Sequence, residues 1–353
     1  MQTTLLGIAI ALILALVAAL VGPLLIDWSH YRPVIEAEAS RVVGAQVHVG
    51  GAIDGRLLPS PRLTLHEVTV GEGGEAVRAS ELTIQFALTP LMRGEWQAEE
   101  MRLSQPELTL GVDSAGHVQA PKIAFGFEPD ALAVERLQIE GGKLVLKDAA
   151  NDHAVSIDNV FFNGRARSLL GPFNGSGSLT VAGDHYSVDV SAGRYSDSGV
   201  KLHLGIQPTN HPFSIETDGT LSFDEGKPKF DGNLALGPPP GLARDAKPWS
   251  LRGKLTAGAR AALLQNLQFV YGKESEALKL AGSVRLDLGR QPSLSAELNT
   301  ARLDLDRMLT ASDGTPQAPS EALRALAQWS GGAAFRSVVP IQIGLSVNEV
   351  ALG

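Results

Sequence analysis

Residues 199–207 read GVKLHLGIQ, and this stretch decides the fold class. Its even-numbered positions, from Val200 to Ile206, are all apolar, whereas lysine, histidine and glycine stand between them. Successive side chains of a β-strand point to opposite faces of the sheet. A period of two therefore predicts a strand with one apolar face and one wet face.

The same period recurs along most of the chain after residue 44, with glycine-containing turns at short intervals. The clearest further runs are residues 63–70, 186–190, 213–217, 284–288 and 294–298. A sheet of this length must hide its apolar face by stacking, by closing into a barrel or by curling into a groove. We expect a mainly β body whose long, curled, mostly antiparallel sheet forms an apolar groove.

The candidate site consists of apolar residues on this face. A contiguous apolar surface is avoided by soluble proteins unless it binds something, and an elongated apolar ligand such as an acyl chain would fit it. A dry core is the alternative, which the periodicity does not exclude. The predicted groove-lining residues are Leu63, Leu65, Leu144, Leu146, Val188, Val200, Leu202, Leu204, Ile206 and Leu286.

The first 26 residues carry no charged side chain, and the first charge is Asp27. Residues 3–26 would make a helix of about 36 Å, long enough for a bilayer core of about 30 Å. The alternative is a cleaved signal peptide, which would have a basic start and a shorter apolar run. We expect residues 1–26 to be a retained transmembrane anchor. The flanking charges are too weak to set its orientation.

Residues 27–44 are predicted to follow as a short amphipathic helix. Pro33 suits the first turn, and Gly44 is a suitable stop. Its apolar stripe consists of Val34, Ile35, Ala39, Val42 and Val43.

Two β sections are expected after this helix, over residues 45–236 and 242–353. The segment 237–241, GPPPG, separates them because proline cannot continue a ladder of backbone hydrogen bonds. One further helix is predicted at residues 320–329, which lie between Pro319 and two glycines. The chain ends within an apparent strand pattern, so we expect the second section to be incomplete.

A weak internal echo runs through the first section. Residues 101–110 and 137–146 share their spacing of apolar residues at an offset of 36, and residues 63–68 (LTLHEV) resemble residues 155–160 (VSIDNV). Such repetition predicts a quasi-repeated hairpin unit and an elongated sheet. Unrelated hairpins can share such short patterns too.

Composition argues against several classes of function. The absence of cysteine removes disulfides, thiolate metal sites and cysteine nucleophiles. A net charge of -8 with scattered basic residues argues against a nucleic-acid partner. Asp304 and Asp306 flank Leu305 and come nearest to an acidic pair that could hold a metal or act as acid and base, but a solvated strand face explains them better. No HExxH, Walker loop or Gly-x-Ser-x-Gly motif is present. We expect no enzyme, no metal and no cofactor.

The order of these features resembles the AsmA family of bacterial envelope proteins. In that family a helix after the anchor leads into a TG-x-x-V-x-V-x-G strand, a proline-containing turn and a strand with an acidic–valine pair. Val43-Gly44 stands here in place of the usual Thr-Gly. The segments that carry the resemblance are DWSHYRP (27–33), IE (35–36), VGAQVHVGG (43–51), LPSP (58–61) and EVTV (67–70), followed by PWSLRG (248–253) and LDLDR (303–307).

The resemblance implies that the chain is the amino-terminal part of a family member. It implies a single-pass anchor in the bacterial inner membrane through residues 3–26, with the body in the periplasm. It also implies a role in outer-membrane biogenesis and a likeness to groove-forming bridge proteins that pass phospholipids between membranes. Phospholipid is the partner it implies, together with other envelope proteins.

Three functional hypotheses follow. The first is a non-enzymatic, membrane-anchored protein that carries phospholipid along an apolar β groove between the inner and outer membranes. The second is a scaffold that affects the assembly or targeting of outer-membrane proteins through protein contacts. Polar substitutions at Leu202 and Leu204 separate the two, because only a lipid channel needs an apolar face. An anchored hydrolase is the third and weakest, because no nucleophile–base motif is visible.

Overall fold

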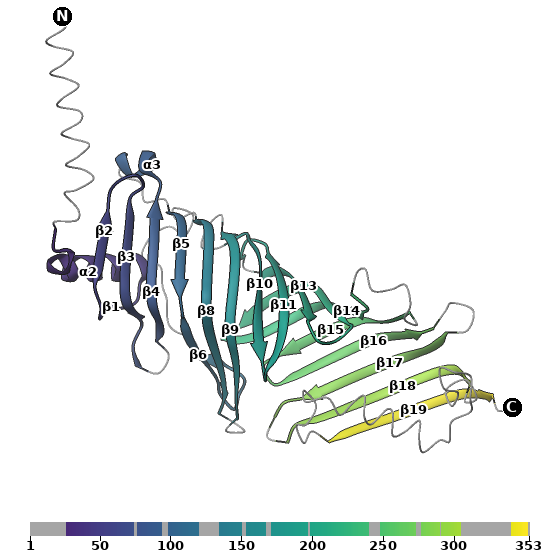
Figure 1. Cartoon of the computed structure of the whole chain (residues 1–353). Coiled ribbons are helices and arrows are strands. Elements are labelled where there is room, and N and C mark those ends of the chain that lie inside the picture. Colours follow the sequence, from purple (N-terminus) through teal and green to yellow (C-terminus); the bar gives the residue numbers. More distant parts are fainter. Residues whose placement is uncertain are drawn as a thin grey trace, which may run out of the picture.

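The described strands of the protein form one 19-stranded sheet (Figure 1). The structure is a computed structural model that describes residues 26–73, 76–93, 98–119, 134–149, 153–166, 171–196, 198–239, 248–272, 277–289, 291–304 and 340–351. Three short helices accompany the sheet: η1 (Trp28–Tyr31), α2 (Arg32–Val43) and α3 (Leu88–Met92). The prediction of a mainly β protein is therefore confirmed.

The described strands range in length from two residues in β7 to fifteen in β8. Their bounds are β1 (Val47–Val49), β2 (Ile53–Arg56), β3 (Arg62–Val70), β4 (Val77–Phe86), β5 (Ala98–Ser104), β6 (Glu107–Val112), β7 (Val118–Gln119), β8 (Val134–Asp148), β9 (His153–Ala166), β10 (Phe173–Val181), β11 (Asp184–Ala192), β12 (Val200–Pro208), β13 (Ser214–Asp224), β14 (Lys227–Gly237), β15 (Trp249–Gly258), β16 (Ala261–Tyr271), β17 (Leu278–Asp287), β18 (Ser293–Asp304) and β19 (Ile341–Ala351).

Strand order follows chain order with few exceptions. Strands β1 and β2 both pair with β3, and β5 and β6 lie one after the other along β8. From β8 to β19 each strand pairs with the next. The pairings are antiparallel except for β5 with β8, β6 with β8, and β18 with β19. The sheet is thus mixed but mostly antiparallel.

The proline-rich segment that we expected to separate two β sections does not interrupt the sheet. Strand β14 ends at Gly237, and β15 begins at Trp249. The two strands are antiparallel neighbours, with Leu236 opposite Leu251. The described strands of the expected sections 45–236 and 242–353 therefore belong to one sheet.

The sheet curls. In Figure 1 the strands from β1 to β9 stand side by side, and the sheet turns over β10–β13, so that β16–β19 run at a steep angle to the first strands. A strongly twisted sheet of this size curls because each strand rotates relative to its neighbour.

Helix α2 covers the beginning of the apolar face. Val47, Val49 and Leu65 belong to the cluster of buried residues beneath it, and Ile35 and Ala39 of α2 pack against this cluster. Gly44 ends the helix in the left-handed region, at φ 67°, and Pro33 stands in its first turn. These residues play the parts that the sequence predicted for them.

The predicted apolar stripe of this helix is partly wrong. Val34 is 67% exposed, whereas Ile35, Ala39 and Val43 contact the sheet together with Trp28 of the preceding turn. The helix begins at Arg32 rather than Trp28, because residues 28–31 form a separate 3-10 turn. That turn changes which residues face the sheet.

Helix α2 also covers the backbone edge of β1. Ser40 Oγ accepts a hydrogen bond from the Val47 N–H at 2.8 Å, and Glu36 Oε1 accepts one from the Val49 N–H at 2.7 Å. Arg32 donates to the Val49 carbonyl at 2.8 Å and to the Gly51 carbonyl at 2.7 Å. Open sheet edges invite pairing with other chains, so these contacts protect the first edge of the sheet.

Several predictions lie outside the described residues. These are the anchor over residues 3–26, apart from Ile26, the helix at residues 320–329, and Asp306. Within the part of the chain that the structure describes, no helix combines the length and the apolar character needed to cross a membrane.

Candidate functional site

The candidate site is the apolar face of the sheet. Residues that lie opposite each other on paired strands share a face, so the printed registers trace one row of side chains across the sheet. Every member of this row is apolar or glycine. We call it the apolar row; it comprises Ile53, Leu65, Leu82, Leu103, Ile139, Phe162, Gly177, Val188, Ile206, Ile215, Leu236, Leu251, Phe269 and Leu280.

Among the described elements, a helix covers the apolar row only at its beginning. Ile53 and Leu65 lie under α2 and are 4% and 3% exposed. Every later member of the row is only half-buried. An ordinary core would bury such side chains. The face beyond α2 therefore retains apolar surface over the length of the sheet.

All ten predicted groove-lining residues lie on this face. Leu65, Val188 and Ile206 belong to the apolar row itself. The other seven stand two or more positions from the row along their strands, at partners that preserve the face: Leu63 faces Ile84, Leu144 faces Ile157, Leu146 faces Val155, Val200 faces Leu221, Leu202 faces Ala192, Leu204 faces Val190, and Leu286 faces Leu294.

Nine of the ten are half-buried, whereas Leu65 is buried in the cluster beneath α2. Leu65 is thus packed as a core residue. That the other nine contact a ligand stays a prediction.

Two phenylalanines on this face were not predicted. The Phe162 ring lies over Gly164 and Gly175, where an added Cβ would come within 2.5 Å and 2.6 Å of the ring. Phe230 lies over Gly219 and Gly232 in the same manner, at 2.6 Å and 2.8 Å. Only glycine permits such close approach. The signal in the sequence was a phenylalanine near glycines of neighbouring strands, which needs the register to be recognised.

A line of backbone irregularities crosses the first half of the sheet. Glu67, Gln105 and Asn159 have φ values of 54°, 49° and 49°, and Gly141 has 64°. Gln105, Gly141 and Asn159 are close together because the Gln105 N–H donates to the Glu140 carbonyl at 2.7 Å and because Gly142 lies opposite Val160. Bulges bend a strand and increase its twist. A row of them gives the sheet a common line of bending.

Long-range contacts join the two sides of the curl, among them a hydrogen bond from the Val118 N–H to the Gly226 carbonyl at 3.1 Å. Arg260, in the turn between β15 and β16, forms an ion pair with Asp148 at the end of β8, with 2.6 Å between Nη1 and Oδ1. Its Nη2 donates to the carbonyls of Val112, at 3.2 Å, and of Asp113. Both charged side chains are mostly buried, at 19% and 26% exposure. We call this contact the Arg260 clamp.

The turn beside the clamp is ordered by its own carboxylate. Asp113 Oδ1 accepts from the N–H groups of Ala115 and His117, both at 2.9 Å, and Oδ2 lies 2.8 Å from His117 Nδ1. The hydrogen bond from the His117 side chain, supported by that from its backbone, lowers the pKa of Asp113 to about 2. The side chain of Arg260 lies beside Gly116, which has a φ of 89°.

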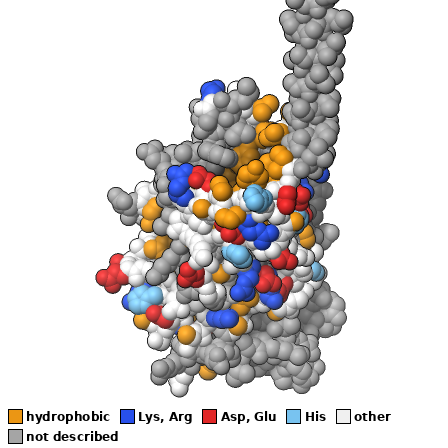
Figure 2. Space-filling model, turned by 90° about the vertical axis from the view of Figure 1, so that its left-hand side faces the viewer, with side chains coloured by type: hydrophobic (Ala, Val, Ile, Leu, Met, Phe, Trp, Pro, Cys, Tyr) orange, Lys and Arg blue, Asp and Glu red, His pale blue; other side chains and the backbone are white. Residues whose placement is uncertain are grey.

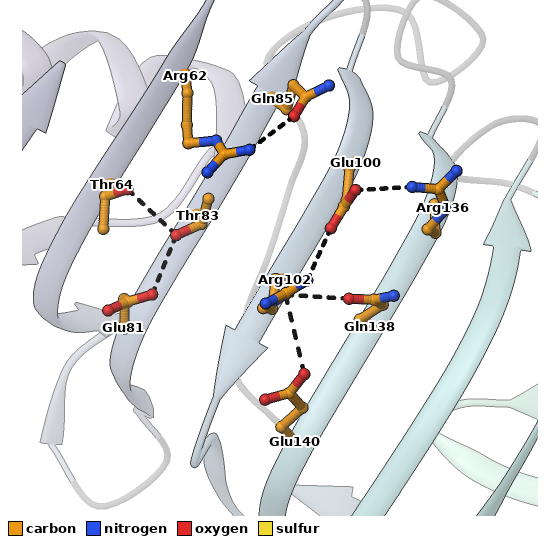
Figure 3. Close-up of polar contacts among 10 residues, drawn as sticks. All are labelled: Arg62, Thr64, Glu81, Thr83, Gln85, Glu100, Arg102, Arg136, Gln138 and Glu140. Carbon is orange, nitrogen blue, oxygen red and sulfur yellow. Dashed lines mark hydrogen bonds and ion pairs between the residues drawn. The ribbon is translucent and has the colours of Figure 1, made fainter. Parts of the chain in front are cut away.

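The opposite face of the sheet is polar. Figure 3 shows a ladder of contacts over β3, β4, β5 and β8 in which Arg136 donates to Glu100 at 2.8 Å and Arg102 donates to Glu100 at 3.1 Å. Arg102 also donates to Gln138 at 3.0 Å. Exposed pairs of this kind contribute little stability each. These charged side chains keep this face of the sheet in contact with water, whereas the apolar row lies on the opposite face.

Charges of both signs are mixed at the end of the sheet that carries α2. Figure 2 views this end and shows hydrophobic side chains gathered in its upper part, with acidic, basic and histidine side chains intermingled below them. Within the described ranges, no group of three or more histidine and acidic side chains is arranged to hold a metal ion.

The first third of the chain has the elements of the resemblance in their expected order. Helix α2, the strand with Val47 and Val49, and β3 with Glu67-Val68 follow one another and form a single packed unit. Residues 2–124 match the model of the AsmA family. The AsmA resemblance is thus confirmed over this range. No curated protein and no solved structure matches the chain.

The AsmA match is consistent with a role in the cell envelope or at the outer membrane. It reaches as far as β7, so the apolar face of the AsmA-matching region continues into strands that lie beyond the match.

Proposed function

We propose that the protein is a non-enzymatic, membrane-anchored protein of the bacterial cell envelope that carries phospholipid acyl chains along its apolar face. The apolar row is the observation that carries this proposal. It runs without a polar member from β2 to β17, and beyond α2 its side chains are half-exposed. Acyl chains are elongated and apolar, so they match both the length and the chemistry of this face.

The curl supports the same proposal. The Arg260 clamp holds the end of β8 near the turn before β16, and on this proposal the apolar side chains of the intervening strands line the inside of the curl. Lipid held there would be shielded from water on one side by the sheet. Anchorage through residues 3–26 in the inner membrane, with the body in the periplasm, would place one end of this face beside a bilayer.

The experiment compares lipid retained by the full chain and by two variants on one strand. Leu204→Glu places a charge on the apolar face, between Val190 and Thr217. Gln207→Glu places the same carboxylate on the wet face of β12 and is the matched control. The purified proteins are exchanged through detergent, and phospholipid per protein is measured by mass spectrometry of solvent extracts.

We expect wild type and Gln207→Glu to retain similar amounts, and Leu204→Glu to retain several-fold less, because a charge in contact with acyl chains is costly to desolvate. Lipid bound to the anchor is common to all three proteins and cancels in the comparison. Far-ultraviolet circular dichroism checks that the variant remains folded.

Equal retention by a folded Leu204→Glu variant would contradict the proposal, as would lipid-free wild type. If Leu202→Glu and Leu204→Glu also kept outer-membrane protein assembly intact in cells, a scaffold acting through protein contacts would explain the protein instead.

A further inference from the structure

A shallow cavity of about 500 Å³ lies on the polar side of the sheet, over β8–β11. Each of the four strands β8, β9, β10 and β11 contributes two lining residues whose side chains, by the strand registers, lie on the polar face. These are Gln138 and Glu140, Phe161 and Asn163, Ser176 and Ser178, and Ser187 and Asp189.

A bulge places an aromatic ring among these polar side chains. Asn159 has a φ of 49°, and the register of β9 against β10 shifts beside it. After the bulge, Phe161 lies opposite Ser178 on the polar face, while Phe162 belongs to the apolar row. Phe161 is 49% exposed. Phe161 therefore presents an exposed phenyl ring among polar side chains on the wet face of the sheet.

The polar side chains around this ring have unused hydrogen-bonding capacity. Within the part of the chain that the structure describes, none of the side chains of Asn163, Ser176, Ser178, Ser187 and Asp189 makes a hydrogen bond. Together they offer an amide, three hydroxyls and a carboxylate, hence both donors and acceptors. A ligand rich in hydroxyl groups could satisfy them.

Gln138 and Glu140, which line the cavity from β8, both contact Arg102. Arg102 donates to Gln138 Oε1 at 3.0 Å and lies 3.9 Å from Glu140 Oε1, as Figure 3 shows. Arg102 also donates to Glu100, so its charge is already shared among acidic partners. The lining contains two carboxylates and no lysine or arginine. An anionic ligand is therefore disfavoured, since it would approach two like charges.

We propose that this cavity binds a neutral oligosaccharide. Sugar rings present C–H groups on one face, which pack on a phenyl ring, and hydroxyls around the rim, which pair with amide, hydroxyl and carboxylate groups. The cavity lies within the range of roughly 300–1,000 Å³ that small-molecule sites occupy. Four members of the apolar row, Ile139, Phe162, Gly177 and Val188, also line the cavity. The polar side chains proposed to contact the sugar lie on the opposite face from the side chains of the row.

The test uses the full chain in a detergent without a sugar headgroup, because a glucoside or maltoside detergent would compete for the site. Maltotriose, cellotriose and chitotriose serve as neutral probes, and trigalacturonic acid serves as an anionic probe of equal length. Binding is measured by isothermal titration calorimetry. Phe161→Ala removes the ring, and Phe223→Ala is the matched control, because Phe223 is 51% exposed but lies outside the cavity.

We expect at least one neutral trisaccharide to bind with a Kd of about 1 mM or tighter. Phe161→Ala should weaken this binding about tenfold or more, and Phe223→Ala should leave it unchanged. Trigalacturonic acid should bind more weakly than the best neutral probe, and Asp189→Asn should reduce that difference.

Three results would overturn the inference. One is the absence of binding by all neutral probes up to about 10 mM. The second is equal binding by wild type and a folded Phe161→Ala variant. The third is preferential binding of the anionic probe. Loss of lipid retention in the Leu204→Glu variant bears on the other face and leaves this inference untouched.

Discussion

Met101 and Leu137 lie directly opposite one another on the parallel strands β5 and β8, although 36 residues separate them in the chain. The same offset pairs Leu108 with Leu144 in β6 and β8. The internal echo in the sequence therefore has a simple meaning. The echo predicts a repeated hairpin unit, but the two echoing segments instead pair with each other in register as parallel strands.

The second echo has a different cause. Residues 63–68 and 155–160 lie in β3 and β9, which are not neighbours. They share a bulge: Glu67 and Asn159 occupy equivalent positions in the two segments, and both have positive φ. The similarity thus reflects a residue with positive φ at the same position of both segments.

The bulge at Asn159 leads to the first prediction. A left-handed conformation costs an L-residue about 1–2 kcal/mol, and asparagine tolerates it better than a β-branched residue. Asn159→Val should therefore lower the free energy of unfolding by about 1–2 kcal/mol more than Asn163→Val does. Asn163 is in the same strand without positive φ, which makes it the matched control. Urea unfolding followed by circular dichroism provides the measurement, and equal losses would show that Asn159 is unstrained.

The protection of the β1 edge by α2 leads to the second prediction. Glu36→Ala leaves the Val49 N–H without its acceptor, and a hydrogen bond to a charged group contributes about 1.5–3 kcal/mol. We expect a loss of stability of that order and an increased tendency to associate, because the edge becomes open. Glu38→Ala, which breaks only the exposed pair with Arg41, should change neither. Thermal unfolding and light scattering test both outcomes.

The third prediction concerns the Arg260 clamp. Arg260→Ala, Asp148→Ala and the double variant form a cycle in which the coupling free energy should be about 1–3 kcal/mol, since the pair is mostly buried. The exposed pair of Lys254 and Asp231, 3.6 Å apart, should show much smaller coupling in a parallel cycle. Coupling no larger than in the exposed pair would mean that the clamp does not hold the curl together.

The fourth prediction concerns pH. The pKa of Asp113 falls from 3.8 to about 2 in the folded chain because its carboxylate is hydrogen-bonded to His117. Since the folded pKa lies below the unfolded one, the ionised carboxylate stabilises the fold above about pH 4, and this contribution disappears as the pH falls towards 2. In Asp113→Asn, unfolding should depend less steeply on pH between these values. A wild-type slope in that variant would assign the dependence to other carboxylates.

The alternation of apolar residues was enough to predict the face but not the arrangement of strands. The alternation along Val200–Ile206 assigns successive side chains to opposite faces of the sheet. Because sequential strands pair in order, every predicted residue lies on the same face. A curled sheet was expected, but the Arg260 clamp across the curl could not be predicted, because it joins residues 112 positions apart through an ordinary arginine in a turn.

The polar cavity was missed for a related reason. Phe161 follows Val160 and precedes Phe162, so the sequence there reads as an apolar run with no preferred face. Only the bulge at Asn159 decides which ring points outwards. Asparagine favours left-handed conformations, but a single asparagine does not identify a bulge. The pairing with neighbouring strands determines where such a bulge forms.

The covered edge of β1 has a consequence for how the chain assembles. With α2 occupying that edge, the sheet can grow in one direction, and every strand from β3 onwards has a hydrogen-bonded partner that precedes it in the chain. Strand addition can therefore keep pace with synthesis, because each new strand meets a finished template as it emerges. The amino-terminal unit would act as the nucleus, and the order of translation would become the order of folding.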